Sequence, residues 1–247
     1  MQPSVRIQLC GPFLVEVDGR RLTLPGRQSR LLFAYLVLHR PGPVPRDRLI
    51  DELWGGSPPP AAGSALNALV SRVRATTGPA MVRGRSELSV ELPASAVVDV
   101  ETALSSAHRA ESAVVAGDWL RAWPAALTAR FVAGRPFLPE ATAPWAESWR
   151  TRLGDVHARA LECYATACLS IGGAELPGAE RAARDLVEAA PLRETGHLLL
   201  MRSLAARGNV AEALVAYELL RVRLRDELGV DPCAAVRSAH ADLLRSR

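Results

Sequence analysis

PPPAAGSALNALVSRVRATT, residues 58–77, decides the fold that the sequence predicts. Its prolines end one segment, and the residues after them predict a helix of about four turns. Apolar side chains recur at positions i, i+3, i+4 and i+7 of this helix, so they form a stripe that must face a core. The stripe consists of Leu66, Leu69, Val70 and Val73.

The opposite side of the same helix carries small residues along its middle, with asparagine and arginine at its edges. The small residues are Ser64, Ala68, Ser71 and Ala75, and the flanking ones are Asn67, Arg72 and Arg74. Such a helix can lie close to another surface and donate hydrogen bonds on both sides of the contact. The DNA major groove is about 12 Å wide, and its base edges are read through Arg and Asn. The alternative is an ordinary surface helix with solvated arginines.

Elements on both sides of this helix complete a winged helix, the helix-turn-helix variant with a flanking β-hairpin. Alternating apolar residues and an Asp18-Gly19 turn predict a small antiparallel sheet first. Two helices follow the sheet, and two short strands follow the third helix. The predicted strands are Val5–Leu9, Phe13–Val17, Arg21–Leu24, Met81–Arg85 and Glu87–Leu92, and the first two helices are Arg27–Arg40 and Pro45–Trp54.

From Val97 onward the sequence predicts alanine-rich helices joined by short loops. Their predicted ranges are Asp99–Ala116, Trp119–Phe131, Trp145–Ile171, Ala179–Ala190, Glu194–Arg207, Val210–Leu228 and Ala234–Arg245. Ala179, Ala183 and Leu186 recur 34 residues later as Ala213, Tyr217 and Leu220. Thirty-four residues is the period of tetratricopeptide repeats, which favours that repeat; generic antiparallel helix packing is the alternative. The predicted class is an α+β N-terminal winged helix followed by an all-α tetratricopeptide-like domain.

Composition excludes several kinds of chemistry. The 247 residues contain no lysine, so neither a Walker A loop nor a lysine Schiff base is available. The four cysteines lack metal-ligand spacing, and we expect buried structural thiols, with no metal and no cofactor. No apolar run reaches the length of a signal peptide or a membrane span, so we expect a cytoplasmic protein without a membrane partner.

Positive charge is concentrated in the first third of the chain. Residues 1–95 contain twelve arginines against seven acidic residues, whereas residues 96–247 contain eighteen arginines against nineteen acidic residues. This asymmetry indicates a polyanionic partner for the first third.

The sequence resembles the Streptomyces antibiotic regulatory proteins (SARPs), which join an OmpR-like winged helix to a bacterial transcriptional activation domain. The motifs that carry the resemblance are LCGPFLVEVDGRRLTL (9–24), GRQSRLLFAYLVLHR (26–40), RDRLIDELWGGSPPPAAGSALNALVSRVR (46–74), AEALVAYELLRVRLRDELGVDP (211–232) and VRSAHADLLR (236–245). The ELGVDP element is highly characteristic of the family. Two features depart from its pattern: Arg85 follows Gly84 where members usually carry Gly-Tyr, and residues 117–144 fit loosely.

The resemblance implies two domains and a DNA-binding face. Residues 1–95 would form the winged helix and residues 96–247 the activation domain. The third helix would enter the major groove and the hairpin the adjacent minor groove. Candidate DNA contacts are Ser64, Asn67, Ser71, Arg72 and Arg74 on the helix, with Arg83 and Arg85 on the hairpin. Arg27, Gln28 and Arg30 at a helix start are candidates for holding a phosphate, and a solvated helix start is the alternative.

The implied function is transcriptional activation, with an antibiotic biosynthesis cluster as the implied target. The implied partners are double-stranded DNA with direct repeats, RNA polymerase holoenzyme and a second copy of the chain on DNA. One alternative is a non-catalytic helical-repeat adaptor whose winged helix binds protein. Another is an enzyme using Cys163 or Cys168 with His157, although no nucleophile motif surrounds them. We therefore predict no catalytic residue.

Overall fold

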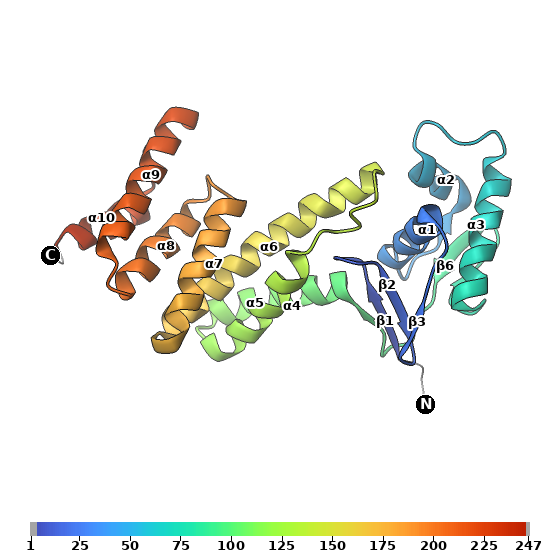
Figure 1. The fold of residues 1–247 in the computed structure, drawn as a ribbon, viewed down its shortest axis with the longest axis horizontal. Helices are drawn as coiled ribbons and strands as arrows, with labels where there is room; N and C mark the ends of the chain where they lie inside the picture. The colour runs from blue at the N-terminus through green and yellow to red at the C-terminus, as the bar shows by residue number, and fades with distance from the viewer. Residues whose placement is uncertain (1–3, 246–247) are drawn as a thin grey trace. The chain divides into compact units, whose positions relative to one another are not determined.

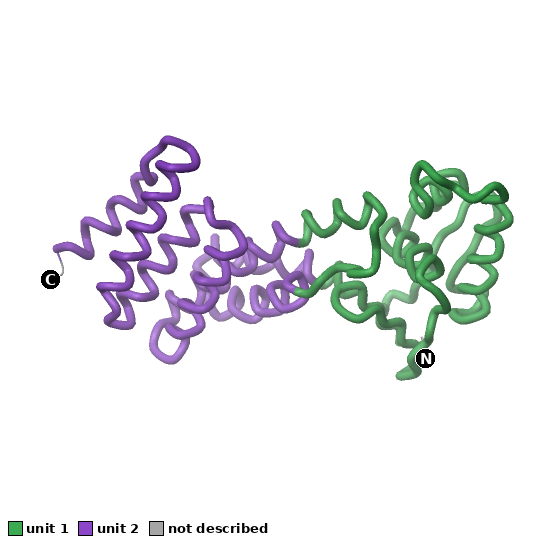
Figure 2. The backbone as a smooth tube through the Cα atoms, turned by 45° about the horizontal axis from the view of Figure 1, so that its top comes forward, with its two compact units in different colours: residues 1–102, 135–153 green, residues 103–134, 154–247 purple. Residues whose placement is uncertain are grey.

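The computed structural model describes residues 4–245 and divides the chain into two compact units. The first unit comprises residues 1–102 and 135–153, and the second comprises residues 103–134 and 154–247 (Figure 2). The division falls inside two helices, α4 (Asp99–Val115) and α6 (Pro144–Ile171). The predicted boundary between residues 95 and 96 stays a prediction, because each compact unit draws on two separate stretches of the chain.

A four-stranded sheet opens the first unit (Figure 1). Its strand order is β3-β2-β1-β7, with β1 and β2 antiparallel and β7 parallel to β1. Val5, Ile7 and Val15 are buried, as the alternation in the sequence predicts. The strands are β1 (Val5–Gln8), β2 (Leu14–Val17), β3 (Arg20–Leu22) and β7 (Val97–Val98).

Three helices and a second small sheet complete the winged-helix part. The almost fully buried helix α1 packs against α3 and β6, so it forms the centre of this core. The second sheet has the order β4-β6-β5, and its β5–β6 hairpin is the feature that we call the wing. The elements are α1 (Arg27–Leu38), β4 (Val44–Pro45), α2 (Arg46–Trp54), α3 (Ala62–Thr77), β5 (Val82–Arg83) and β6 (Glu87–Val90).

Asp99, the first residue of α4, ties the first sheet to residues 135–153. Its carboxylate accepts hydrogen bonds from the backbone N–H groups of Leu9 and Cys10, each at 2.9 Å. Arg135 lies 3.7 Å from the same carboxylate, and Cys10 forms a β-bridge with Phe137. Burial raises the pKa of Asp99, while these N–H groups and Arg135 oppose the rise. Residues far apart in the chain therefore share one buried polar centre.

The second unit is helical, and its last four helices pack on one another. Contacts join α7 to α8, α8 to α9, and α10 to both α8 and α9. Alanines at the contacts, such as Ala179 and Ala213, are fully buried and let neighbouring helices approach closely. Besides the rest of α4 and α6, the helices are α5 (Trp119–Ala133), α7 (Leu176–Ala189), α8 (Glu194–Ala206), α9 (Val210–Leu228) and α10 (Ala234–Arg245).

The sequence predicted the order of elements but missed several features. Strands β4 and β7 are two residues long and lie below the reach of any alternation pattern. Helix α7 begins at Leu176 rather than at Ala179, because Pro177 is tolerated in a first helical turn. The expectation of buried thiols holds for Cys10, Cys163 and Cys168 and is wrong for Cys233, which is exposed just before α10.

His197 makes the second unit sensitive to acid. The side chain is buried in α8, with Nε2 3.0 Å from the carbonyl oxygen of Pro191. Burial lowers its pKa below the usual 6.5, so the unfolded chain takes up a proton first as the pH falls. Its contribution to stability is therefore complete above 6.5 and is lost as the pH falls through its lowered native pKa.

We expect the melting temperature to fall between about pH 7.5 and about pH 5.5, and His197→Gln to flatten part of this decrease. The measurement is thermal unfolding of both proteins across that range. Exposed His108 supplies the control, since His108→Gln should keep the wild-type pH profile. An unchanged profile in His197→Gln would contradict the assignment. Burial also lowers the pKa of His157, so we expect His157 to contribute to the decrease that remains in His197→Gln.

Candidate DNA-binding site

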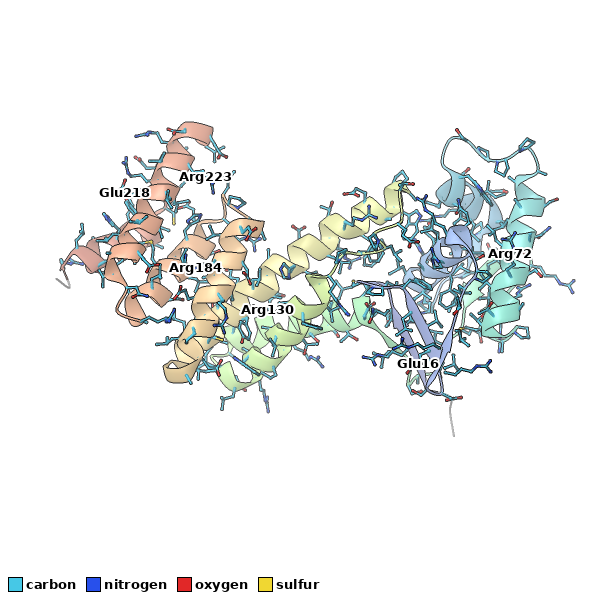
Figure 3. The ribbon with its side chains drawn as sticks, in the orientation of Figure 1. Glu16, Arg72, Arg130, Arg184, Glu218 and Arg223 are labelled. Atoms are coloured by element: carbon cyan, nitrogen blue, oxygen red, sulfur yellow. The ribbon has the colours of Figure 1, made fainter. Side chains whose placement is uncertain are left out.

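Helix α3 presents the two faces that its sequence predicts. The apolar stripe of Leu66, Leu69, Val70 and Val73 is buried against the core. The opposite face is exposed and contains Ser64, Asn67, Ala68, Ser71, Arg72 and Ala75. Figure 3 shows Arg72 on this helix, and no ion pair or side-chain hydrogen bond of Arg72 occurs within residues 4–245. The exposed face of α3, with small residues along its middle and polar side chains beside them, is therefore accessible to another molecule.

Arg74 joins α3 to the wing. Its Nε donates to the carbonyl oxygen of Val82 at 2.9 Å, and its Nη2 donates to that of Gly84 at 2.7 Å. The side chain is half-buried. Two of its five donors are thus used inside the protein, and the DNA contact predicted from the sequence stays a prediction. The structure adds that Arg74 fixes the wing beside the helix.

Arg46, the first residue of α2, makes a second connection to the wing. Its Nη1 donates to the carbonyl oxygen of Arg85 at 3.0 Å, and its Nη2 donates to Oδ1 of Asn67. One guanidinium therefore links α2, α3 and the tip of the wing. Sequence analysis missed Arg46 because its partners are a backbone carbonyl and a side chain on another helix. The sequence did offer one indication of a role for Arg46. It begins a helix within residues 1–95, the part of the chain with an excess of positive charge.

A hollow of about 430 Å³ lies between α3 and the wing. It is lined by Arg46, Asn67, Val70, Ser71, Arg74, Gly84 and Arg85. Three arginines and no carboxylate line it, and Arg72 lies on the neighbouring exposed face of α3. None of these four arginines forms an ion pair among residues 4–245, so their charges remain available to an anion. Arg83 differs, because its Nη1 lies 2.9 Å from Glu91.

Gly84 sets the shape of the wing tip. Its φ of +96° is favourable for glycine and strained for other residues. A Cβ atom there would lie 1.8 Å from the backbone oxygen of Glu87, which is too close for any side chain. The tight turn leaves Arg85 exposed at the tip of the wing. This is the position at which SARPs, the family that the sequence resembles, usually carry tyrosine.

The three candidate residues at the start of α1 already have partners in the first unit. Arg27 donates to the Thr142 hydroxyl at 2.6 Å, and Arg30 pairs with Glu140. Gln28 donates to the carbonyl oxygen of Leu53 at 3.3 Å. Arg27 and Arg30 attach α1 to the segment before α6, and Gln28 attaches it to α2, which are structural roles that the sequence did not predict. Their phosphate contact stays a prediction.

The cysteines that the enzyme alternative requires are poorly suited to nucleophilic chemistry. Burial raises the pKa of Cys163 and of Cys168 to about 11, which disfavours the reactive thiolate. Nδ1 of His157 lies 3.1 Å from the carbonyl oxygen of Arg130, not beside a thiol. Within residues 4–245 no group of three or more metal-ligating side chains occurs, and no helix is long and apolar enough to cross a membrane.

Residues 98–244 match the family model of the bacterial transcriptional activator domain. The regulatory protein AfsR of Streptomyces coelicolor is 32% identical over 244 residues, which cover 98% of this chain and 24% of AfsR. The transcriptional regulator RedD of the same organism is 31% identical over 263 residues, covering 97% of this chain and 70% of RedD. This chain therefore spans about a quarter of AfsR but most of RedD.

A solved structure shows the same fold. Mycobacterium tuberculosis EmbR, in complex with a low affinity phosphopeptide, superposes with a TM-score of 0.85 at 22% identity. The match covers all of this chain and 66% of the EmbR chain. This chain and EmbR thus share a small N-terminal sheet region followed by helices. A winged helix joined to a helical domain requires this arrangement.

Residues 98–244 therefore belong to the class of bacterial transcriptional activator domains. More particularly, the chain belongs to the SARP family, whose members carry the bacterial transcriptional activator domain.

Proposed function

We propose that this chain is a sequence-specific DNA-binding transcriptional activator, and that its target is a secondary-metabolite (antibiotic) biosynthesis cluster. The observation that carries the proposal is the set of four arginines around α3 and the wing, Arg46, Arg72, Arg74 and Arg85, none of which has a carboxylate partner among residues 4–245. Unpaired guanidinium groups attract the phosphate backbone, and counterion release makes that attraction strong at low salt. The similarity to AfsR and RedD supports the proposed target.

In this proposal the exposed face of α3 enters the major groove. Its small residues let the helix approach the bases, while Asn67 and Ser71 reach base edges. Arg72 contacts a phosphate, and Arg85 at the wing tip reaches the adjacent minor groove. Arg74 and Arg46 hold the wing at the spacing that this arrangement needs.

The helical second unit supplies the remaining partners in this proposal. One winged helix buries too little surface for tight specific binding, so a second copy bound beside the first raises the overall affinity. The helical domain engages RNA polymerase holoenzyme and supports contact between the copies. Binding takes place in the cytoplasm on two direct repeats near a promoter.

The spacing of the repeats provides the test. Two copies in the same orientation must meet the same face of DNA, so the repeats should start about 10–11 base pairs apart. We expect the full chain, given random duplex DNA, to enrich such direct repeats and to bind them cooperatively. Inserting about five base pairs turns the second site to the opposite face and should abolish the cooperativity, whereas inserting about ten should restore it.

The measurement is a mobility-shift titration on the three operators. Equal cooperativity with and without the half-turn insertion would contradict the binding of two copies in the same orientation on direct repeats. Enrichment of a palindromic sequence would contradict it as well. Failure to enrich any sequence would contradict sequence-specific binding altogether and would favour the adaptor alternative.

A further inference from the structure

We infer that the second unit binds a second copy of this chain through two different surfaces, with α9 of one copy lying in a groove between α4 and α5 of the other. The inference rests on the proposed function and names the surfaces that would make binding to direct repeats cooperative. The groove has a volume of about 720 Å³ and a mostly apolar lining, which includes Ala113, Ala116, Leu120 and Pro124. Leu120 is 79% exposed, so a large apolar side chain lies open to solvent there.

Helix α9 carries an apolar stripe on the side that does not pack into the unit. Val215, Leu219 and Val222 lie at positions i, i+4 and i+7 and are 58%, 66% and 38% exposed. They therefore share one side of the helix, which we call the α9 stripe. The residues that pack α9 into the unit, among them Ala213 and Leu220, are fully buried on the other side. An amphipathic helix of this kind binds a partner by laying its apolar side into a groove.

The charges beside the two surfaces favour this pairing. Arg109 lines the groove, is exposed and forms no ion pair among residues 4–245, whereas Arg121 pairs with Asp118 and is assigned no role in the contact. Glu212 and Glu218 flank the N-terminal half of the α9 stripe, one on each edge, and arginines flank its C-terminal half. Each glutamate has an arginine partner in its own copy, but exposed pairs contribute little and exchange readily. We therefore place the N-terminal half of the stripe beside Arg109.

A second copy supplies the occupant of the groove, because one copy cannot fill its own. Figure 1 shows α5 and α9 at opposite ends of the second unit, with α7 and α8 between them. Two copies in the same orientation on direct repeats present different surfaces to each other, as a contact between groove and stripe requires. A stripe of three side chains makes a small interface, so the contact should be weak in solution and form where DNA holds two copies together.

The test uses full-length variants that are each defective in one surface. Leu120→Glu puts a charge in the groove, and Leu219→Lys puts one in the α9 stripe. Each variant alone should bind a single repeat within about twofold of the wild type and should lose cooperativity on direct repeats by about 10-fold or more, the effect of removing a central apolar contact. The matched controls, Val115→Glu on α4 and Leu228→Lys on α9, change exposed residues outside the groove and the stripe and should keep wild-type cooperativity.

A mixture of the two variants shows whether the surfaces bind each other. The Leu120→Glu copy keeps its stripe and the Leu219→Lys copy keeps its groove, so an equimolar mixture should recover cooperativity that neither variant shows alone. Mobility-shift titration on direct repeats measures the cooperativity, and a size tag on one variant shows that the recovered complex contains one copy of each. Leu120→Ser or Leu219→Ser replaces a charged variant whose melting temperature falls, because serine removes apolar area without adding charge.

The outcomes distinguish this inference from the proposed function. Wild-type cooperativity in either variant alone would overturn the inference, and so would a mixture no more cooperative than its components. A loss confined to Leu219→Lys would indicate a symmetric contact between two α9 helices and would overturn it as well. Each of these results leaves sequence-specific binding intact. If the wild type enriches no sequence, the proposed function fails instead.

Discussion

Replacing Asp99 with alanine is expected to lower the free energy of unfolding by about 3–5 kcal/mol. The buried N–H groups of Leu9 and Cys10 would both lose their acceptor, and each unsatisfied buried group costs about 1–3 kcal/mol. Arg135 would lose its carboxylate partner at the same time. Because these groups join the first sheet to residues 135–153, the loss should appear in the first compact unit.

Chemical denaturation of the full chain measures this effect, and Asp118 supplies a matched control. Asp118 lies directly before α5, where its carboxylate accepts from the N–H of Arg121 at 3.1 Å near the protein surface. Asp118→Ala should therefore cost only about 1 kcal/mol, the usual value for a helix N-cap. Equal losses in the two variants would contradict the view that Asp99 is the buried polar centre of the first unit.

The double substitution Arg72→Glu, Arg85→Glu is expected to weaken binding to the selected duplex by about 100-fold or more at moderate salt. Both side chains are exposed and form no ion pair among residues 4–245, so the substitutions should leave the fold intact. The substitutions replace attraction to phosphate with repulsion on α3 and on the wing tip. Stability measured by thermal unfolding should stay close to that of the wild type.

A control with the same change in net charge tests whether location matters. Arg121 and Arg181 are exposed on α5 and α7, away from the winged-helix elements in the sequence. Arg121→Glu, Arg181→Glu should reduce the affinity less than about threefold, since it changes only the long-range field. Equal losses in the two double variants would mean that total charge, rather than the face formed by α3 and the wing, governs binding.

Local patterns in the sequence were sufficient for the helices and for the buried side of α3. Leu66 and Val73 face the core because helical spacing places them on one side, which depends only on residues within the helix. Helical spacing also predicted which residues lie on the exposed side of α3. The wing hairpin was also predicted, but its predicted first strand, Met81–Arg85, ran through Gly84, which the structure places in the turn with a positive φ.

Contacts between distant residues were beyond these patterns. Arg74 and Arg46 donate to backbone carbonyls in the wing, and every residue has a carbonyl, so sequence gives no sign of the partner. The parallel pairing of β1 with β7 involves two residues of β7, too few for an alternation pattern. Residues 135–143 were the least predictable part, since they join the first unit through Asp99, Arg27 and Arg30.

This arrangement changes how the DNA-binding part should be studied. A fragment of residues 1–95 lacks β7, Asp99 and the segment that pairs with Arg27 and Arg30. We expect the fragment to bind DNA weakly, partly because its sheet is incomplete. Full-length protein with substitutions is therefore the appropriate material for binding experiments.

The most direct test of DNA binding by α3 and the wing is the salt dependence of affinity for the selected duplex. The logarithm of the binding constant should fall steeply with the logarithm of salt concentration, by about 0.9 for each phosphate neutralised. The full-length variant Arg72→Ala, Arg85→Ala removes two such contacts, so its slope should be shallower by about 1.8. A wild-type slope near zero, or identical slopes for the wild type and the variant, would contradict phosphate binding by this face.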